Sequence, residues 1–172
     1  MRERRERQDY IVQALRESAD PIRGEDLAAR CQVTRQVVVH EIALLKARGT
    51  PIVSTPRGYY LSGSPEGMEQ TVLAVHHAPE QTADELYTLV DHGVVVENVM
   101  IEHPIYGELQ GALRLRSRQD VRDFMQEISE GRVALLSSLT QGDHLHTVSY
   151  RDLRQLDQAI LALEGKGIVA HR

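Results

Sequence analysis

A Gly-, Ser- and Pro-rich segment at residues 61–67 constrains the fold of this chain more than any other feature. Such residues cluster in turns and linkers, and here they lie between two stretches whose apolar residues recur at regular spacings. The balance of charge changes at the same place: residues 1–62 carry 11 Lys and Arg against 8 Asp and Glu, whereas residues 63–172 carry 9 against 17. We therefore expect two small domains, 1–62 and 63–172, of which only the first suits the phosphates of a nucleic acid.

Three helices and a hairpin are predicted for the first domain. Apolar residues recur at helical spacing in a first helix, which a Ser-Ala-Asp-Pro sequence ends because proline cannot continue it. A second helix near 24–31 is separated by a short turn from a third over 35–48, for which Thr34 is a suitable N-cap. Residues 52–61 follow as two short strands around a Pro-Arg-Gly turn. This order is typical of a winged helix-turn-helix.

The third helix carries most of the residues that we expect at DNA. An α-helix fits the major groove and presents its N-terminal side chains to base edges, while nearby cations hold phosphates. The candidates are Thr34, Arg35, Gln36 and His40 on or beside the helix, and Arg57 at the hairpin turn. On an isolated helix such side chains are more often a solvated face, but the complete order of helices and hairpin favours DNA. Winged helices also bind proteins, and that alternative stays open.

Alternating strands and helices predict a compact α+β fold for the second domain. The helices are expected on one face of the sheet. Strands are predicted at 71–76, 94–102, 109–115, 145–148 and the C-terminus, and helices at 80–91, 117–128 and 151–164.

Seven of the eight histidines lie in the second domain, and two of them form a His144-Leu-His146 sequence on a predicted strand. Residues two apart on a strand point to the same face, so these imidazoles could share a divalent cation of the Zn or Ni type. On its own the pair is a weak signal, with exposed or hydrogen-bonded histidines as the alternative. His77 at a strand end and Glu85 on the next helix could complete a shell of three nitrogens and one carboxylate. Such a shell leaves a position for water or a ligand, which fits sensing or hydrolysis.

Several classes of protein are disfavoured by the sequence. It has no Gly-rich phosphate loop, nucleophile elbow or His-Glu-x-x-His helix, so we favour a sensor over an enzyme. A metal-dependent hydrolase of pyridine-type substrates and a regulator that responds to the metal ion itself are the alternatives. No stretch approaches the roughly 18 apolar residues that span a bilayer, and the charged N-terminus resembles no signal segment, so we expect a cytoplasmic protein. The single cysteine, Cys31, is expected to be a small buried apolar residue.

Four segments resemble a known family of regulators. Residues 34–49 are similar to the biotin-repressor-like helix-turn-helix, and residues 77–86, 102–108 and 139–147 together resemble the three-histidine (3H) domain. This combination is typical of niacin-responsive transcription repressors. The resemblance implies a dimeric repressor of genes for NAD-precursor salvage or uptake, with nicotinic acid as co-repressor and a transition metal, nickel or zinc, in the second domain.

The resemblance also implies a ligand set for the metal. Transferred residue by residue, it consists of His77, Glu85, His144 and His146. His76 leaves the register open, although the spacing of eight residues to Glu85 favours His77. Two positions depart from the family pattern, His40 where a glutamine is expected and Asn98 where an acidic residue is common. Nicotinic acid is expected to bind near the metal and the 140–143 loop.

Overall fold

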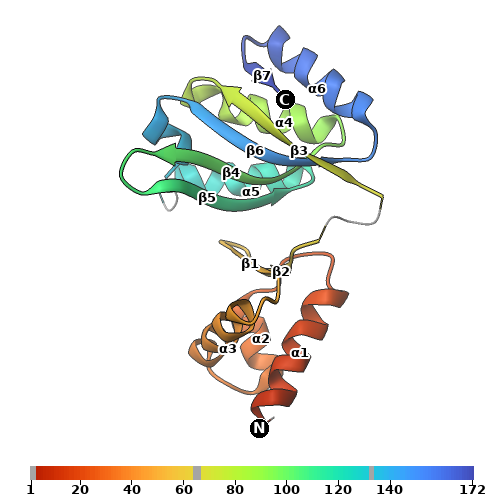
Figure 1. The fold of residues 1–172 in the computed structure, drawn as a ribbon, viewed down its shortest axis with the longest axis vertical. Coiled ribbons are helices and arrows are strands. Elements are labelled where there is room, and N and C mark those ends of the chain that lie inside the picture. Colours follow the sequence, from red (N-terminus) through yellow and green to blue (C-terminus); the bar gives the residue numbers. More distant parts are fainter. Residues whose placement is uncertain (1–2, 64–66, 132–133) are drawn as a thin grey trace. The chain divides into compact units, whose positions relative to one another are not determined.

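The structure, a computed structural model, describes residues 3–63, 67–131 and 134–172. It divides into two compact units, Met1–Gly63 and Ser64–Arg172, each with its own core (Figure 1). Residues 64–66, in the middle of the predicted linker, lie outside the described residues. In the described ranges, no helix is both long and apolar enough to cross a membrane.

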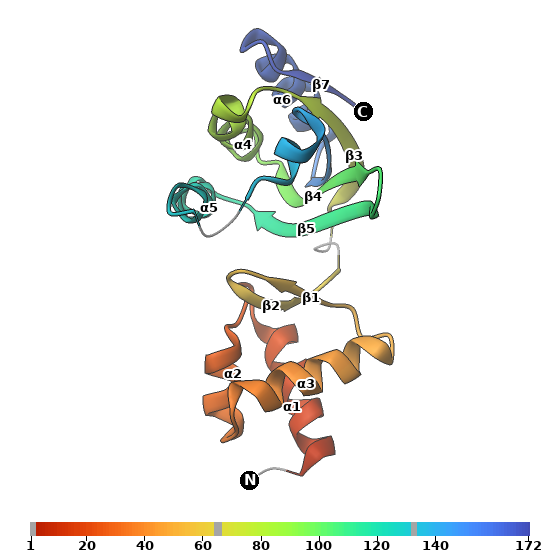
Figure 2. The same ribbon diagram turned by 90° about the vertical axis from the view of Figure 1, so that its left-hand side faces the viewer.

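The first unit has the predicted order of three helices and a hairpin (Figures 1 and 2). Gln32 adopts a left-handed conformation with φ of 56°, which ends the second helix, and the Thr34 side chain caps the third by accepting a bond from the Val37 N–H at 3.4 Å. The core of the unit includes Leu27, Val38 and Cys31, each at most 1% exposed, as expected for apolar positions on facing helices. The elements are α1 (Arg4–Glu17), α2 (Gly24–Cys31), α3 (Arg35–Ala47), β1 (Ile52–Thr55) and β2 (Gly58–Leu61).

The β1–β2 hairpin is fastened to the segment between α1 and α2. Ile22 exchanges two main-chain hydrogen bonds of 2.9 Å with Tyr59 on β2. Gly58 has a φ of +128°, and a Cβ there would lie 2.4 Å from the Ile22 carbonyl oxygen, so only glycine permits this close approach. The hairpin therefore has the position of a wing that is fixed to the helices of its own unit.

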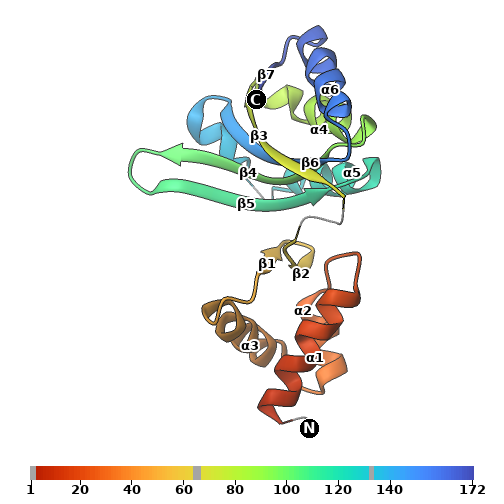
Figure 3. The same cartoon turned by 45° about the vertical axis from the view of Figure 1, so that its right-hand side comes forward.

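The second unit is a five-stranded antiparallel sheet with the strand order β5-β4-β6-β3-β7 (Figure 3). Helices α4, α5 and α6 cover one of its faces, and the predicted α+β class is confirmed. Its strands are β3 (Glu69–His76), β4 (Val95–His103), β5 (Gly107–Leu115), β6 (Asp143–Tyr150) and β7 (Val169–His171). Its helices are α4 (Thr82–Asp91), α5 (Arg118–Ser129) and α6 (Leu153–Gly165), with short 3-10 turns at Pro79–Gln81 and Leu136–Thr140, the second of which the sequence did not predict.

Alternation along β3 and β6 decides which side chains meet the helices. Leu73 lies opposite His146 and is fully buried, whereas the neighbouring Val72 is 46% exposed on the other face. His144 and His146 are both buried on the helix side, and Leu145 between them is 40% exposed. The helix-covered face of the sheet thus brings two imidazoles into the layer where α4 packs.

Candidate functional site

Four buried side chains from three elements converge on the helix-covered face of the sheet. Glu85 of α4 lies at the centre: its Oε2 is 2.5 Å from His77 Nε2 and 3.4 Å from His144 Nε2, and its Oε1 is 2.9 Å from His146 Nε2. His77 directly follows β3, and the other two histidines are on β6. These are the four residues that the sequence analysis proposed as metal ligands, and the fold brings them all together.

Each imidazole is oriented by a main-chain carbonyl on its far side. The Nδ1 atoms of His77, His144 and His146 lie 2.7, 2.9 and 2.6 Å from the carbonyl oxygens of Ala78, Gly142 and Asn98. Because a carbonyl oxygen only accepts, each Nδ1 carries the proton of that bond. In a neutral ring the Nε2 atom then has a free lone pair, and all three lone pairs point towards the Glu85 carboxylate. This arrangement, in which one ring nitrogen is tied and the other is free, is the one in which histidine binds metals.

The site has acceptors that no group among the described residues satisfies. The side chains of all four residues are at most 3% exposed. His146 Nε2 and Glu85 Oε1 make no hydrogen bond although both are buried. Three nitrogen lone pairs around a carboxylate repel one another unless a cation lies between them, and imidazole with carboxylate is a donor set suited to Zn and Ni. The residues therefore fit a divalent transition metal.

The pKa values of Glu85, His77 and His146 follow the same logic. Burial raises the pKa of Glu85, but the charge of His146 and the hydrogen bonds to the imidazoles outweigh it and hold the pKa well below its usual value. Burial lowers the pKa of His77 and of His146, and contact with Glu85 outweighs this and raises both. In the absence of a metal, protons on His77 and His146 supply the positive charge that the carboxylate needs.

A conformationally special glycine supports the site. Gly142 has a φ of +101°, and a Cβ at this position would lie 2.3 Å from the His77 carbonyl oxygen. The same residue accepts the bond from His144 Nδ1. The sequence analysis assigned Ala78 and Gly142 no role in metal binding, and it marked Asn98 only as a departure from the family pattern. Their contributions are main-chain groups, for which side-chain patterns carry no signal.

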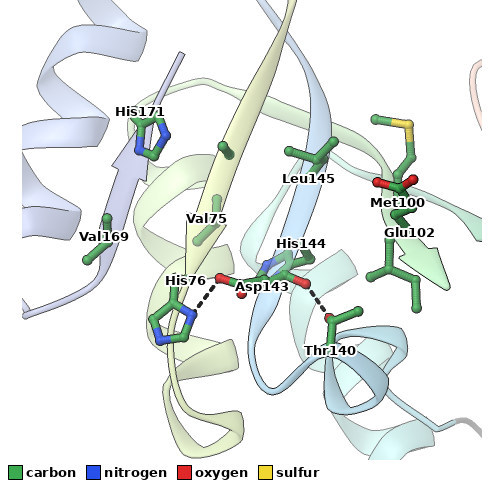
Figure 4. A pocket seen from close by; sticks show the side chains of 12 residues that line it. Val75, His76, Met100, Glu102, Thr140, Asp143, His144, Leu145, Val169 and His171 are labelled. Carbon is green, nitrogen blue, oxygen red and sulfur yellow. Dashed lines mark hydrogen bonds and ion pairs between the residues drawn. The ribbon is translucent and has the colours of Figure 1, made fainter. Parts of the chain in front are cut away.

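His76 and His77 point to opposite sides of the sheet. His76 Nδ1 is 2.7 Å from Asp143 Oδ1 on the face that the helices leave uncovered (Figure 4). A groove of about 480 Å³ lies there. His77, as the spacing of eight residues favoured, is the histidine that contacts Glu85. The groove is lined by Thr140 and Asp143 of the predicted ligand loop, by His144, and by apolar residues that include Met100, Leu145 and Val169.

The remaining histidines of the second unit lie outside the group of four side chains centred on Glu85. His103 Nδ1 accepts bonds from the Ile105 and Tyr106 N–H groups and so fixes the β4–β5 turn. His171 is exposed. His92 is half-buried at the end of α4, where its Nδ1 donates to the Thr88 carbonyl oxygen at 2.7 Å. A helix end offers free carbonyls to such a donor.

The candidate DNA-binding residues lie at two places in the first unit. Thr34, Arg35, Gln36 and His40 are exposed at or near the start of α3. Arg35 forms an ion pair of 2.9 Å with Glu25 on α2, and both side chains are more than 60% exposed. Arg57 is half-buried in the hairpin turn. A hollow of about 340 Å³ is lined jointly by Arg35 and by hairpin residues that include Thr55 and Pro56. The start of α3 and the hairpin turn are thus neighbours on one surface.

Two small apolar residues extend the exposed face of α3. Val39 is 41% exposed, and Ala43, one turn further, is exposed as well. Together with Gln36 and His40 they form one stripe along the helix. They were not among the predicted DNA contacts, although their helical spacing from Gln36 was a signal that could have found them.

Comparisons with known proteins agree with both units. Residues 7–60 match the family model of an HTH domain, and residues 70–172 match that of the 3H domain. The chain is 42% identical over 166 residues to the transcription repressor NadR of Bacillus subtilis (strain 168), covering 95% of this chain and 92% of the relative. It is 38% identical over 166 residues to the probable transcription repressor NiaR of Thermotoga maritima (strain ATCC 43589 / DSM 3109 / JCM 10099 / NBRC 100826 / MSB8), covering 96% and 94%.

The fold and these matches define a DNA-binding transcription repressor that joins a helix-turn-helix to a 3H domain. The chain belongs to the NadR and NiaR family of transcription repressors. Members of this family are repressors rather than enzymes, so the hydrolase alternative is not retained.

Proposed function

We propose that this chain represses genes of NAD-precursor salvage or transport, with nicotinic acid as co-repressor. It acts as a homodimer on an operator in double-stranded DNA, with nickel or zinc in the second unit. The names NadR and NiaR of its relatives support a link to NAD and niacin. The single observation that carries the metal site is the convergence of three Nε2 lone pairs on the buried carboxylate of Glu85.

In this proposal the metal is held by His77, Glu85, His144 and His146. Once bound, it supplies the positive charge that fixes these four side chains in one arrangement. The chain contributes the orientation of each ring through a main-chain carbonyl, and it excludes water by burying all four side chains. The sequence and the geometry both fit nickel and zinc.

Nicotinate is proposed to bind in the groove on the uncovered sheet face. A volume of about 480 Å³ is within the range of small-molecule sites, and the groove offers apolar side chains for a pyridine ring. Thr140, Asp143 and His144 line it, and His144 also belongs to the metal set. Ligand in the groove would therefore contact the strand that carries the metal ligands, which gives it a route to favour one conformation of the dimer.

DNA recognition is assigned to the exposed start of α3 and to the hairpin. Thr34, Arg35, Gln36 and His40 would face the major groove, and Arg57 would contact a phosphate or the minor groove. Two copies related by a two-fold axis would place their α3 helices at half-sites about one helical turn apart. Nicotinate would strengthen operator binding by preferring that geometry.

A gel-shift titration on the gene's own upstream region tests the co-repressor assignment. Operator affinity should rise when nicotinate is added to the metal-loaded protein, and nicotinamide serves as the control ligand because it lacks the carboxylate. Unchanged affinity at millimolar nicotinate would remove nicotinate as the co-repressor.

Substitutions on β6 test the proposed metal ligands. His144→Ala and His146→Ala should each lose bound metal in elemental analysis, because each removes one imidazole from the centre. Leu145→Ala is the matched control, since this residue lies between them and points to the other face. Full retention of metal in both histidine variants would exclude them as ligands.

A second candidate is a regulator that responds to the metal ion itself. It is favoured by the enclosure of the four ligands, which are at most 3% exposed and leave little access for an organic ligand. In that case metal addition alone would change operator affinity in the gel shift, and nicotinate would add nothing.

A further inference from the structure

We infer that Asn98 of β4 is a positioning residue for the metal centre, because its side chain holds a main-chain carbonyl in place for His146. This inference rests on the proposed metal site and concerns how the fold maintains it. Asn98 contributes no atom to the ligand set itself. It acts through the carbonyl oxygen that accepts the bond from His146 Nδ1 at 2.6 Å.

The strand register is irregular on both sides of Asn98. Between the pairs Val96–Val148 and Met100–Leu145, β4 advances four residues while β6 advances three. On the other side the pairs run from Val96–Leu115 to Asn98–Ala112, and there it is β5 that holds the extra residue. Arg114, within this part of β5, has a φ of 47°, which is the left-handed conformation typical of a bulge. Asn98 thus lies where regular main-chain pairing is interrupted.

The side chain of Asn98 supplies the missing connection between β4 and β6. Its Oδ1 accepts from the Thr147 main-chain N–H at 2.8 Å, and its Nδ2 donates to Thr147 Oγ1 at 3.1 Å. The carboxamide thereby takes the place of a ladder bond that the bulge removes. The Asn98 carbonyl is then free to turn towards the helix-covered face, where it meets His146.

The consequence for the metal centre follows from the adjacent positions of His146 and Thr147. The carboxamide fixes the distance between β4 and β6 at the residue next to the ligand. We call these two bonds between the Asn98 carboxamide and Thr147 the clamp. With the clamp in place, the His146 ring keeps its proton on Nδ1 and presents Nε2 to Glu85, at 2.9 Å from Oε1. Loss of such an orienting partner typically costs 10- to 100-fold in metal affinity.

Asn98→Ala removes both clamp bonds, whereas Asn98→Asp can restore them. An aspartate accepts from the Thr147 N–H, and the Thr147 hydroxyl can reverse its role and donate to the second oxygen. We expect the alanine variant to bind zinc at least tenfold more weakly in competition with a chromophoric chelator. The aspartate variant should stay within about threefold of the parent protein.

Gln70→Ala is the matched control. Gln70 also forms a side-chain bond across the sheet, from its Nε2 to Ser149 Oγ at 3.0 Å, but on β3 and away from the histidines. It should leave zinc affinity unchanged. Thermal unfolding in EDTA reports any general weakening of the sheet, and the visible spectrum of the cobalt-substituted protein reports the ligand geometry. Asn98→Ala should change the cobalt spectrum, which a purely structural role would not do.

The outcomes distinguish failure of the proposed metal site from failure of the positioning role of Asn98. If the parent protein binds no zinc, nickel or cobalt, the proposed metal site itself fails. If the parent binds metal and Asn98→Ala matches it in affinity and cobalt spectrum, the metal site stands and the positioning role of Asn98 is overturned. An aspartate variant as weak as the alanine variant would also contradict the clamp.

Discussion

Two buried glutamates, one in each unit, have opposite kinds of surroundings. Glu41 of α3 accepts hydrogen bonds from Arg7 and Gln8 of α1, each with a contact of 2.5 Å, so its charge is fully matched by protein donors. Glu85 is surrounded by three imidazoles whose Nδ1 protons are already used elsewhere. At the residue scale, this difference separates a carboxylate that holds two helices together from one that requires a cation or added protons.

Glu41→Ala should destabilise the first unit by about 2–4 kcal/mol, because it leaves Arg7 and Gln8 without their acceptor. Arg7 and Gln8 lower the pKa of Glu41 by more than burial raises it. The stabilisation is therefore present above pH 4.5 and is lost as the pH falls through the lower folded-state pKa. Urea unfolding of both proteins between pH 3 and 7 measures the effect. Glu25→Ala, which removes an exposed pair, is the control and should cost under about 1 kcal/mol.

The proposed metal centre should give a pH dependence of the opposite sign. Glu85 raises the pKa of His77 and His146 above 6.5 in the metal-free protein, so the stability from these contacts is complete below 6.5 and is lost as the pH rises. A metal replaces those protons. The increase in Tm on adding zinc should thus be larger at pH 8 than at pH 6, as calorimetry with and without EDTA can measure. An equal increase at both pH values would contradict this protonation scheme.

At the scale of elements, the loop that leads into β6 depends on one glycine. Gly142→Ala would place a methyl group 2.3 Å from the His77 carbonyl oxygen in a backbone with φ of +101°, so the loop must shift. Because His77 and His144 both contact this loop, we expect metal binding to fall at least tenfold. Gly165→Ala serves as control, since no atom lies within 4 Å of its added Cβ. Metal affinity equal to that of the parent would show that the loop adapts.

In the first unit, the β1–β2 hairpin likewise depends on one glycine. Gly58→Ala would force β2 away from Ile22, because the new Cβ would lie 2.4 Å from that residue's carbonyl oxygen. Operator affinity should fall while metal content in the second unit stays the same, as a gel shift and elemental analysis of one preparation would reveal. A variant with normal operator affinity would argue against a contribution of the hairpin to DNA binding.

The sequence predicted the elements and the candidate metal ligands, and it missed the main-chain contacts that depend on distant strands. The two-residue spacing of His144 and His146 was sufficient to place both rings on one face. The spacing of His77 and Glu85 was compatible with convergence but could not establish it, because the packing of α4 on the sheet lies outside any local pattern. The Asn98 carbonyl depends on the register of three strands at once, which no single segment of sequence encodes.

At the scale of the whole molecule, the two units have separate cores and different charge. We expect hydrogen exchange, followed by mass spectrometry in rising urea, to show two unfolding steps. EDTA should lower the urea concentration at which peptides from 67–172 lose protection and leave that of the other peptides unchanged. Glu41→Ala should do the same for peptides from 3–63 alone. A single step affected by both treatments would mean that the units unfold as one cooperative body.

The main-chain carbonyls behind the three histidines have a consequence for how such a site changes over time. The groups that aim the rings belong to the backbone, so their positions depend on the path of the chain, which the Asn98 side chain and Gly142 help to fix. Side chains at neighbouring positions can then be replaced without turning the rings, as long as the bulge at Asn98 and the turn at Gly142 persist. Substitutions on the surface that selects a ligand or an operator would then leave the aim of the three rings intact.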